Sequence, residues 1–165
     1  MCPTKHAKRM IAEAMLMRGS NFVASAVLLK NHGGYQYVVL HLLSQGIEII
    51  LKALLLAHDY DKFIKQLGGR RGQLGHDLLE AARAVATCYQ LRPMRPELEG
   101  ELKTLNDYYS NHRLRYASSV DILVDADSIP YEQVLRRAVS LVRLGTRKKD
   151  RHTQATQAKH SQRAM

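Results

Sequence analysis

The stretch from Tyr35 to His58 constrains the fold of this 165-residue chain more than any other part of the sequence. Drawn as a helix, it is apolar around most of its circumference, so it belongs either at the centre of a helical bundle or in a membrane. Glu48 and Lys52 lie near its middle, where their charges would be costly in lipid. We therefore expect a buried helix and no membrane span. Its apolar residues are Val39, Leu42, Leu43, Ile49, Ile50, Ala53, Leu54 and Ala57.

Two polar features of this helix carry further information. Glu48 and Lys52 are four residues apart with the acid first, which is the favourable order for an ion pair within a helix. Gly46 lowers helix propensity by about 1 kcal/mol relative to alanine. Its presence in mid-helix predicts that a second helix approaches closely at this point.

Amphipathic segments on both sides predict further helices at residues 4–30, 76–91 and 130–144, one that begins at Glu97, and a short helical turn at 62–67. The first carries an apolar stripe at Met10, Ala14, Met17, Phe22, Ala26 and Leu29. The helix that begins at Glu97 has its stripe at Leu98, Leu102, Leu105, Tyr109 and His112. This spacing predicts that His112 faces the core.

The pattern contains no convincing strand, and the predicted fold class is therefore all-α. We expect an antiparallel up-and-down bundle of about five helices. Residues 1–145 would form this bundle, and residues 146–165, which have almost no apolar periodicity, would form a basic, disordered tail.

Basic residues outnumber acidic ones by ten, and the excess is concentrated near the C-terminus. The segment from Arg147 onward holds six basic residues and one acidic residue. Upstream of it, Arg136, Arg143 and Arg147 share one face of the last predicted helix. This face, together with Lys148 and Lys149, could follow RNA phosphates without reading sequence, whereas the alternative is a solubilising terminus.

The remaining composition argues against several kinds of site. Cys2 and Cys88 form no disulfide framework or Cys-x-x-Cys pair, and with no convincing secretory signal the expected setting is the reducing cytoplasm. The histidines are scattered without the spacing of metal ligands, and the acidic run at 121–127 fits a solvated connector better than an ion-binding loop. We therefore expect no metal and no cofactor.

Three segments resemble HEPN domains, a family of prokaryotic helical bundles. Residues 43–58 resemble the family's second helix, with an internal glutamate and a Lys-Ala-Leu-Leu run. Gly75-His76-Asp77-Leu78 resembles the His-Asp-Leu that starts its next helix, and Arg115-Tyr116 resembles an Arg-Tyr pair that follows a later one. The three occur in the family's order and span residues 43–116.

The resemblance implies a bundle that is often dimeric and that occurs in toxins, defence factors and partners of nucleotidyltransferase-like proteins. Many members are metal-independent ribonucleases with an arginine, four to six residues, and then a histidine in a late helix. His112 is present here, but the positions that should hold arginine are Leu105, Asn106 and Asp107. The ribonuclease motif is thus degenerate, because the cation that would stabilise the phosphate is missing.

His112 is the best single candidate for chemistry, and Arg115 or Arg113 could supply the missing cation. The alternative is a structural histidine within the bundle. Arg71 and His76 also match the arginine-to-histidine spacing, but they lie in a glycine-rich loop, where His76 and Asp77 could simply begin a helix. Arg113 and Tyr116 are candidates for RNA contact, as single-strand binders combine basic and aromatic groups.

Two functional hypotheses follow. The first is a non-catalytic, homodimeric interaction or RNA-binding module that could pair with a nucleotidyltransferase-like protein in a toxin–antitoxin or defence setting. The second is a divergent metal-independent ribonuclease that uses His112 with a nearby arginine. The basic net charge is compatible with both hypotheses, because net charge indicates which partners a protein attracts and not which fold it adopts.

Overall fold

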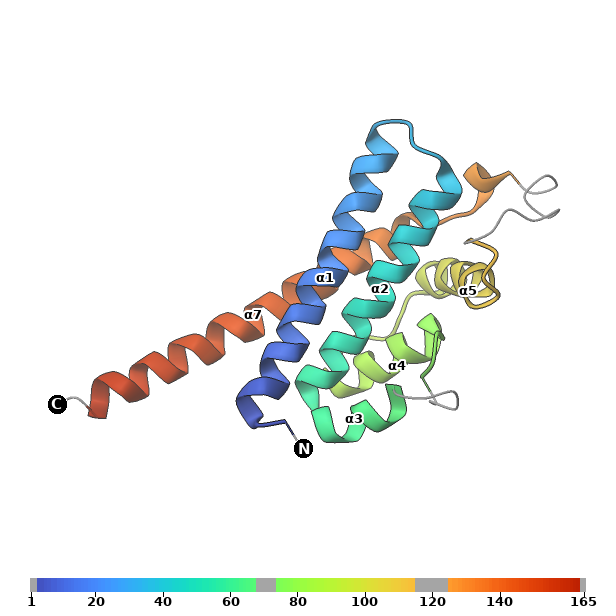
Figure 1. Cartoon of the computed structure of the whole chain (residues 1–165). Coiled ribbons are helices and arrows are strands. Elements are labelled where there is room, and N and C mark those ends of the chain that lie inside the picture. The colour runs from blue at the N-terminus through green and yellow to red at the C-terminus, as the bar shows by residue number, and fades with distance from the viewer. Residues whose placement is uncertain (1–2, 68–73, 115–124, 164–165) are drawn as a thin grey trace.

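A computed structural model describes residues 3–67, 74–114 and 125–163, with side chains as far as Arg147. Within these residues the chain is helical and has no strand, which confirms the all-α bundle (Figure 1). The helices are α1 (Lys5–Asn31), α2 (Gln36–His58), α3 (Tyr60–Leu67), α4 (Leu78–Cys88), α5 (Pro96–Ser110), the 3₁₀ turn η1 (Ala126–Ser128) and α7 (Glu132–Arg163).

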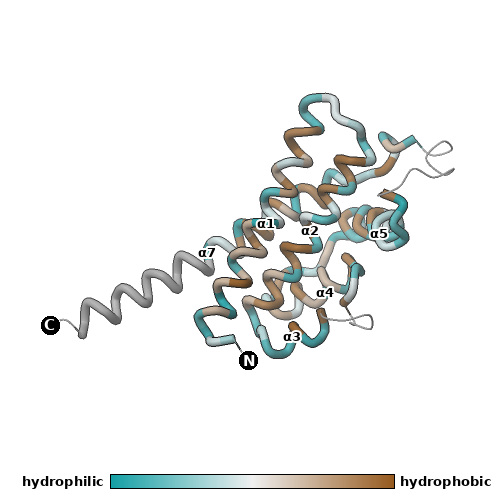
Figure 2. Tube along the Cα trace, viewed as in Figure 1, coloured by the Kyte–Doolittle hydropathy of each residue, from teal (hydrophilic) through white to brown (hydrophobic). Residues whose placement is uncertain are grey.

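Helix α2 lies at the centre of the bundle, as its sequence predicts. It forms an antiparallel hairpin with α1, and α3, α4, α5 and α7 pack against it. Figure 2 shows apolar residues along most of its length. Within the described residues α2 alone is long and apolar enough to cross a membrane, but 67% of that stretch is buried inside the bundle. Burial of this extent is typical of the core helix of a helical bundle.

The hairpin of α1 and α2 is closed by a contact between two glycines. A Cβ added at Gly46 would lie 2.8 Å from Val23 Cγ2 and 3.0 Å from the Gly19 carbonyl oxygen, and one added at Gly19 would meet Ile50 and the Gly46 carbonyl. The backbones therefore touch where the helices cross. This confirms the close approach predicted from Gly46.

Three helices end in the same hydrogen-bonding motif, in which the residue after the C-cap adopts a left-handed conformation. These residues are Gly33 (φ 70°), Gln90 (φ 50°) and His112 (φ 58°). In each case the amide of the following residue donates to a carbonyl five positions back, at 2.9 to 3.0 Å. Only α1 places a glycine there, although glycine adopts this conformation without strain.

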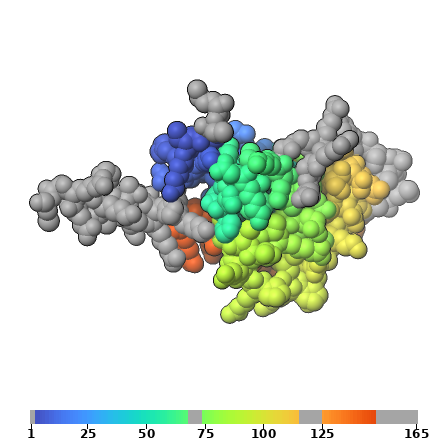
Figure 3. Space-filling model, turned by 90° about the horizontal axis from the view of Figure 1, so that it is seen from below, coloured from blue at the N-terminus to red at the C-terminus, as the bar shows by residue number. Residues whose placement is uncertain are grey.

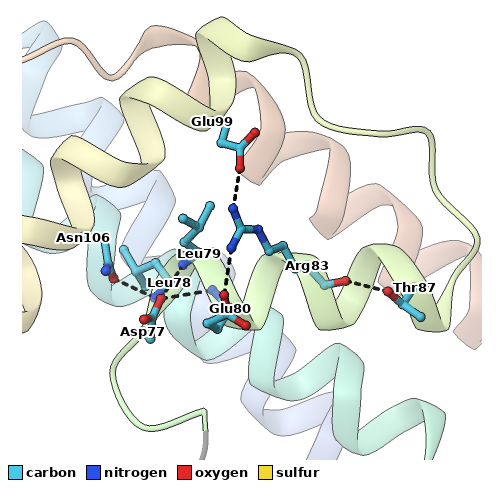
Figure 4. A network of polar contacts seen from close by, with 8 residues as sticks. All are labelled: Asp77, Leu78, Leu79, Glu80, Arg83, Thr87, Glu99 and Asn106. Atoms are coloured by element: carbon cyan, nitrogen blue, oxygen red, sulfur yellow. Dashed lines mark hydrogen bonds and ion pairs between the residues drawn. The ribbon is translucent and has the colours of Figure 1, made fainter.

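Side chains from α5 cap the first turns of α4 and α7. Asn106 Oδ1 accepts a hydrogen bond from the Leu78 amide at 2.8 Å, and Glu101 Oε2 accepts from the amides of Gln133 and Val134. Asp77 is the N-cap of α4 and accepts from the amides of Leu79 and Glu80, as Figure 4 shows. These bonds satisfy amides that have no partner within their own helix.

Exposed ion pairs also join neighbouring helices. Arg83 of α4 contacts Glu80 in its own helix and Glu99 of α5 (Figure 4). Lys8 of α1 donates to Asp61 of α3 at 2.6 Å. Figure 3 views the end of the bundle where α3 lies between α1 and α4. Surface pairs of this kind contribute little stability, so the apolar core carries most of it.

The structure differs from the sequence prediction in three elements. Helix α4 begins at Leu78 and not at residue 76, because Asp77 takes the N-cap position. Met10, Ala14 and Met17 of α1 are exposed, since the buried side of this helix is formed by Ala12, Gly19, Val23 and Ala26. The apolar stripe predicted to face the core is therefore partly exposed to solvent.

The third difference is the C-terminal segment. The sequence predicts a disordered tail over residues 146–165, whereas α7 continues as a helix to Arg163. Figure 1 shows its distal part extending beyond the other helices. Lysine, arginine, glutamine and alanine favour helix, so the backbone can continue a helix that has no apolar stripe.

We predict that Gly46→Ala destabilises the protein by about 1–3 kcal/mol, because the added methyl group overfills the α1–α2 crossing. Gly100→Ala is the matched control, since Gly100 lies in α5 with nothing within 4 Å of an added Cβ. That substitution should stabilise by about 0.5–1 kcal/mol through helix propensity. Urea unfolding of both variants measures the difference, and equal effects would contradict the crossing.

Candidate functional site

Glu48 is the charged residue at the heart of the bundle, and its side chain is only 8% exposed. Its carboxylate accepts hydrogen bonds from Lys52 Nζ at 2.5 Å, from the Tyr109 hydroxyl at 2.5 Å, and from His76 Nδ1 at 3.0 Å. Lys52 belongs to the same helix, Tyr109 to α5, and His76 to the segment before α4. One carboxylate therefore joins three parts of the chain, and the predicted Glu48–Lys52 pair is confirmed.

The pKa of Glu48 is set by competing effects. Burial alone raises the pKa of this carboxyl. The hydrogen bonds from Lys52 and Tyr109, together with the charges of Lys52 and His76, lower the pKa by more than burial raises it. The net pKa lies below the ordinary value of 4.5. Glu48 is thus an ionised group at neutral pH, kept so by its donors.

His76 connects this buried carboxylate to the surface. Its side chain is 56% exposed, while Nδ1 contacts Glu48. An ionised carboxylate can only accept a hydrogen bond, so Nδ1 carries the proton and Nε2 of a neutral ring is left as an acceptor. The same carboxylate–imidazole arrangement orients the histidine of many catalytic sites.

His112 lies beside His76 and not in the core. The two ring centroids are 6.4 Å apart and the rings meet edge to face. Helix α5 ends at Ser110, and His112 is the exposed residue with a left-handed backbone that follows the C-cap. The next buried side chain in the sequence is Leu114. The prediction of a core-facing His112 is wrong, because the 4, 3, 4, 3 spacing of apolar residues continues past the end of the helix.

The ring of Tyr109 packs against two histidines. Its ring centroid is 6.0 Å from that of His41 and 6.3 Å from that of His76. The ring is buried and its hydroxyl is bonded to Glu48, while Asn106 caps α4. These two side chains therefore serve the bundle.

The other candidate residues are divided between two regions. Arg113 is exposed next to His112, with its guanidinium carbon 5.9 Å from the Tyr108 ring centroid. Arg136, Arg143 and Arg147 are all exposed along α7, as predicted. Arg71, Arg115 and Tyr116 lie outside the described residues, and so do the side chains of Lys148 and Lys149.

The described residues contain no group of three histidine, cysteine or acidic side chains that could hold a metal ion. Asp125, one of the acidic residues in the 121–127 run, caps η1 by accepting a hydrogen bond from the Asp127 amide. What the cluster of Glu48, His76 and His112 can do chemically is orient and transfer protons.

The sequence did not identify the contact between Glu48 and His76, or the neighbourhood of His76 and His112. Glu48 is 28 residues from His76 and 61 from Tyr109, so no local pattern joins them. One usable signal was the isolated acid in an otherwise apolar helix, because a buried charge requires partners.

No family model, no curated protein and no solved structure matches this chain.

We predict that Glu48 makes the stability of the fold sensitive to acid. Its pKa is lower in the folded chain than the ordinary 4.5, so its stabilising effect is complete above that value and is lost as pH falls through the folded pKa. The difference in unfolding free energy between wild type and Glu48→Gln should therefore shrink on acidification. Glu97→Gln, an exposed substitution in the first turn of α5, is the control for loss of one charge. A difference that does not change with pH would contradict the assignment.

Proposed function

We propose that this chain is a HEPN-like helical bundle that acts as a non-catalytic, homodimeric RNA-binding module. The observation that carries the proposal is the basic face of α7, where Arg136, Arg143 and Arg147 are all exposed. At 1.5 Å per residue this face is about 16 Å long. A row of exposed guanidinium groups on a helix suits a phosphate backbone.

The course of α7 strengthens this proposal. The helix continues through the basic run Arg147-Lys148-Lys149 and extends beyond the other helices in Figure 1. A segment that is already helical binds without the ordering cost of a disordered tail. Binding of this type depends on charge and not on base sequence.

We predict that replacing Arg136, Arg143 and Arg147 by glutamine weakens binding to single-stranded RNA. Loss of three phosphate contacts should reduce the slope of log affinity against log salt by about 2. The control removes the same charge from Arg92, Arg95 and Lys103, which are exposed elsewhere. Equal loss in both triple variants, measured by fluorescence anisotropy, would contradict an interface on α7.

The exposed stripe of α1 supports the homodimer. Met17 and Leu28 are 64% and 61% exposed, and the exposed Ala14 and Ser25 lie on the same face at helical spacing. If a second copy packed antiparallel about Asn21, each Leu28 would meet Ala14 and each Met17 would meet Ser25. Large residues would then face small ones twice, as a two-fold interface requires.

We predict that Met17→Glu and Leu28→Glu each shift the protein from dimer to monomer in light scattering, since a charge would be buried in the interface. Val139→Glu is the control, because Val139 is an exposed apolar residue of α7. A wild-type chain that is monomeric at its highest soluble concentration would refute the dimer.

The resemblance to HEPN domains also suggests a protein partner. We propose a nucleotidyltransferase-like protein in a cytoplasmic toxin–antitoxin or defence setting. Copurification with a nucleotidyltransferase encoded beside this chain would support the partnership, and separate elution of the two would contradict it.

A second candidate function is a metal-independent ribonuclease at His112. The specific observation in its favour is the exposed position of His112 beside a second imidazole, with Arg113 next in the chain as a cation. Metal-free cleavage of RNA that is lost in His112→Gly would support this candidate over the non-catalytic module.

A further inference from the structure

We propose that His76 and His112 form the proton-transfer pair of an RNA-cleaving site, with Glu48 as the residue that positions His76. This inference rests on the ribonuclease candidate and adds to it a second catalytic group that the arginine-to-histidine spacing did not identify in this role. The substrate class is single-stranded RNA with a free 2′-hydroxyl.

The positions of the two rings allow both to reach one phosphodiester. Both side chains are exposed, and their centroids are 6.4 Å apart. Two imidazoles at this separation can serve two oxygens of one phosphodiester, one on each side of the phosphorus. An imidazole can both accept and donate a proton, so one ring can act as the base and the other as the acid.

The contact with Glu48 gives the two rings different catalytic roles. It places the proton of His76 on Nδ1 and leaves Nε2 as the acceptor, which suits a general base. His112 has no such carboxylate partner in the described residues and is the group left to donate a proton. Among the described residues, the titratable and charged groups around His76 are Glu48 and Lys52 from α2, Tyr109 from α5, His112 from the turn after α5, and Asp77, which follows His76 in the chain.

The backbone at His112 is an independent observation. Gly33 occupies the equivalent position after α1, whereas His112 holds a left-handed conformation that is unfavourable for a non-glycine residue. Strained residues persist where they serve a function or where their surroundings impose them. Here the strained residue is the one that meets His76.

The reaction balances without a metal, cofactor or added water. His76 Nε2 takes the proton of the ribose 2′-hydroxyl, and the 2′-oxygen forms a bond to the adjacent phosphorus. The bond from phosphorus to the 5′-oxygen of the next nucleotide breaks, and the His112 imidazolium protonates that oxygen. The products are a 2′,3′-cyclic phosphate and a 5′-hydroxyl, and Arg113 is placed to neutralise charge on the phosphate.

The test uses the full chain with a single-stranded RNA of mixed sequence in the presence of EDTA. We expect cleavage to 2′,3′-cyclic phosphate ends, identified by mass spectrometry, and no cleavage of the same sequence carrying 2′-O-methyl groups. His76→Gln and His112→Gly should each lower the rate by about 100-fold or more. His112→Gly suits the left-handed backbone, so the fold should be kept or stabilised.

Two controls match these variants. Gln90→Gly changes the equivalent left-handed position after α4, and His32→Ala removes an exposed histidine from the turn between α1 and α2. Both should cleave like wild type. Glu48→Gln should move the acid limb of the kcat/KM profile to lower pH, whereas a purely structural role would lower the rate at every pH without moving that limb.

The outcomes separate the two proposals. Cleavage that needs His112 but not His76 would overturn the imidazole pair and leave the ribonuclease candidate standing. A wild-type protein that binds RNA without cleaving it would overturn both and leave the RNA-binding module. Equal cleavage by wild type and by the His76→Gln, His112→Gly double variant would mean that the activity comes from another site, and would also overturn the pair.

Discussion

The fold and the candidate site depend on one buried carboxylate. Removing Glu48 from water is costly, and the bundle offsets this cost with hydrogen bonds from Lys52, Tyr109 and His76. Because these donors come from α2, α5 and the segment before α4, the carboxylate fixes how three elements meet. Loss of any one donor would leave a buried charge with unsatisfied hydrogen-bonding capacity.

The same carboxylate explains why two surface histidines lie together. It accepts a hydrogen bond from His76. It also accepts one from Tyr109, which lies in the last turn of α5, three residues before His112. The end of α5 then places His112, because the His112 amide donates to the Tyr109 carbonyl and the Arg113 amide donates to the Tyr108 carbonyl. The surface cluster is thus built on an interior interaction.

The helices could be predicted from the sequence because their signals are local. Apolar periodicity located α2, and Gly46 predicted its close contact with α1. The site could not be assembled in this way, since the residues that meet at Glu48 are far apart in the chain. His112 was misplaced because its spacing continues the stripe while no glycine marks the helix end. The exposed Met17 and the helical C-terminal segment were missed because periodicity alone does not show which face a neighbour covers, or where a polar helix stops.

A double-mutant cycle between Glu48→Gln and Tyr109→Phe tests the central interaction most directly. Because the hydroxyl donates to a buried charge, we expect a coupling free energy of about 1 kcal/mol or more in urea unfolding. Tyr89→Phe, which removes a hydroxyl bonded to the Leu54 carbonyl, should be additive with Glu48→Gln. Additivity of Glu48→Gln with Tyr109→Phe, within about 0.5 kcal/mol, would contradict the account.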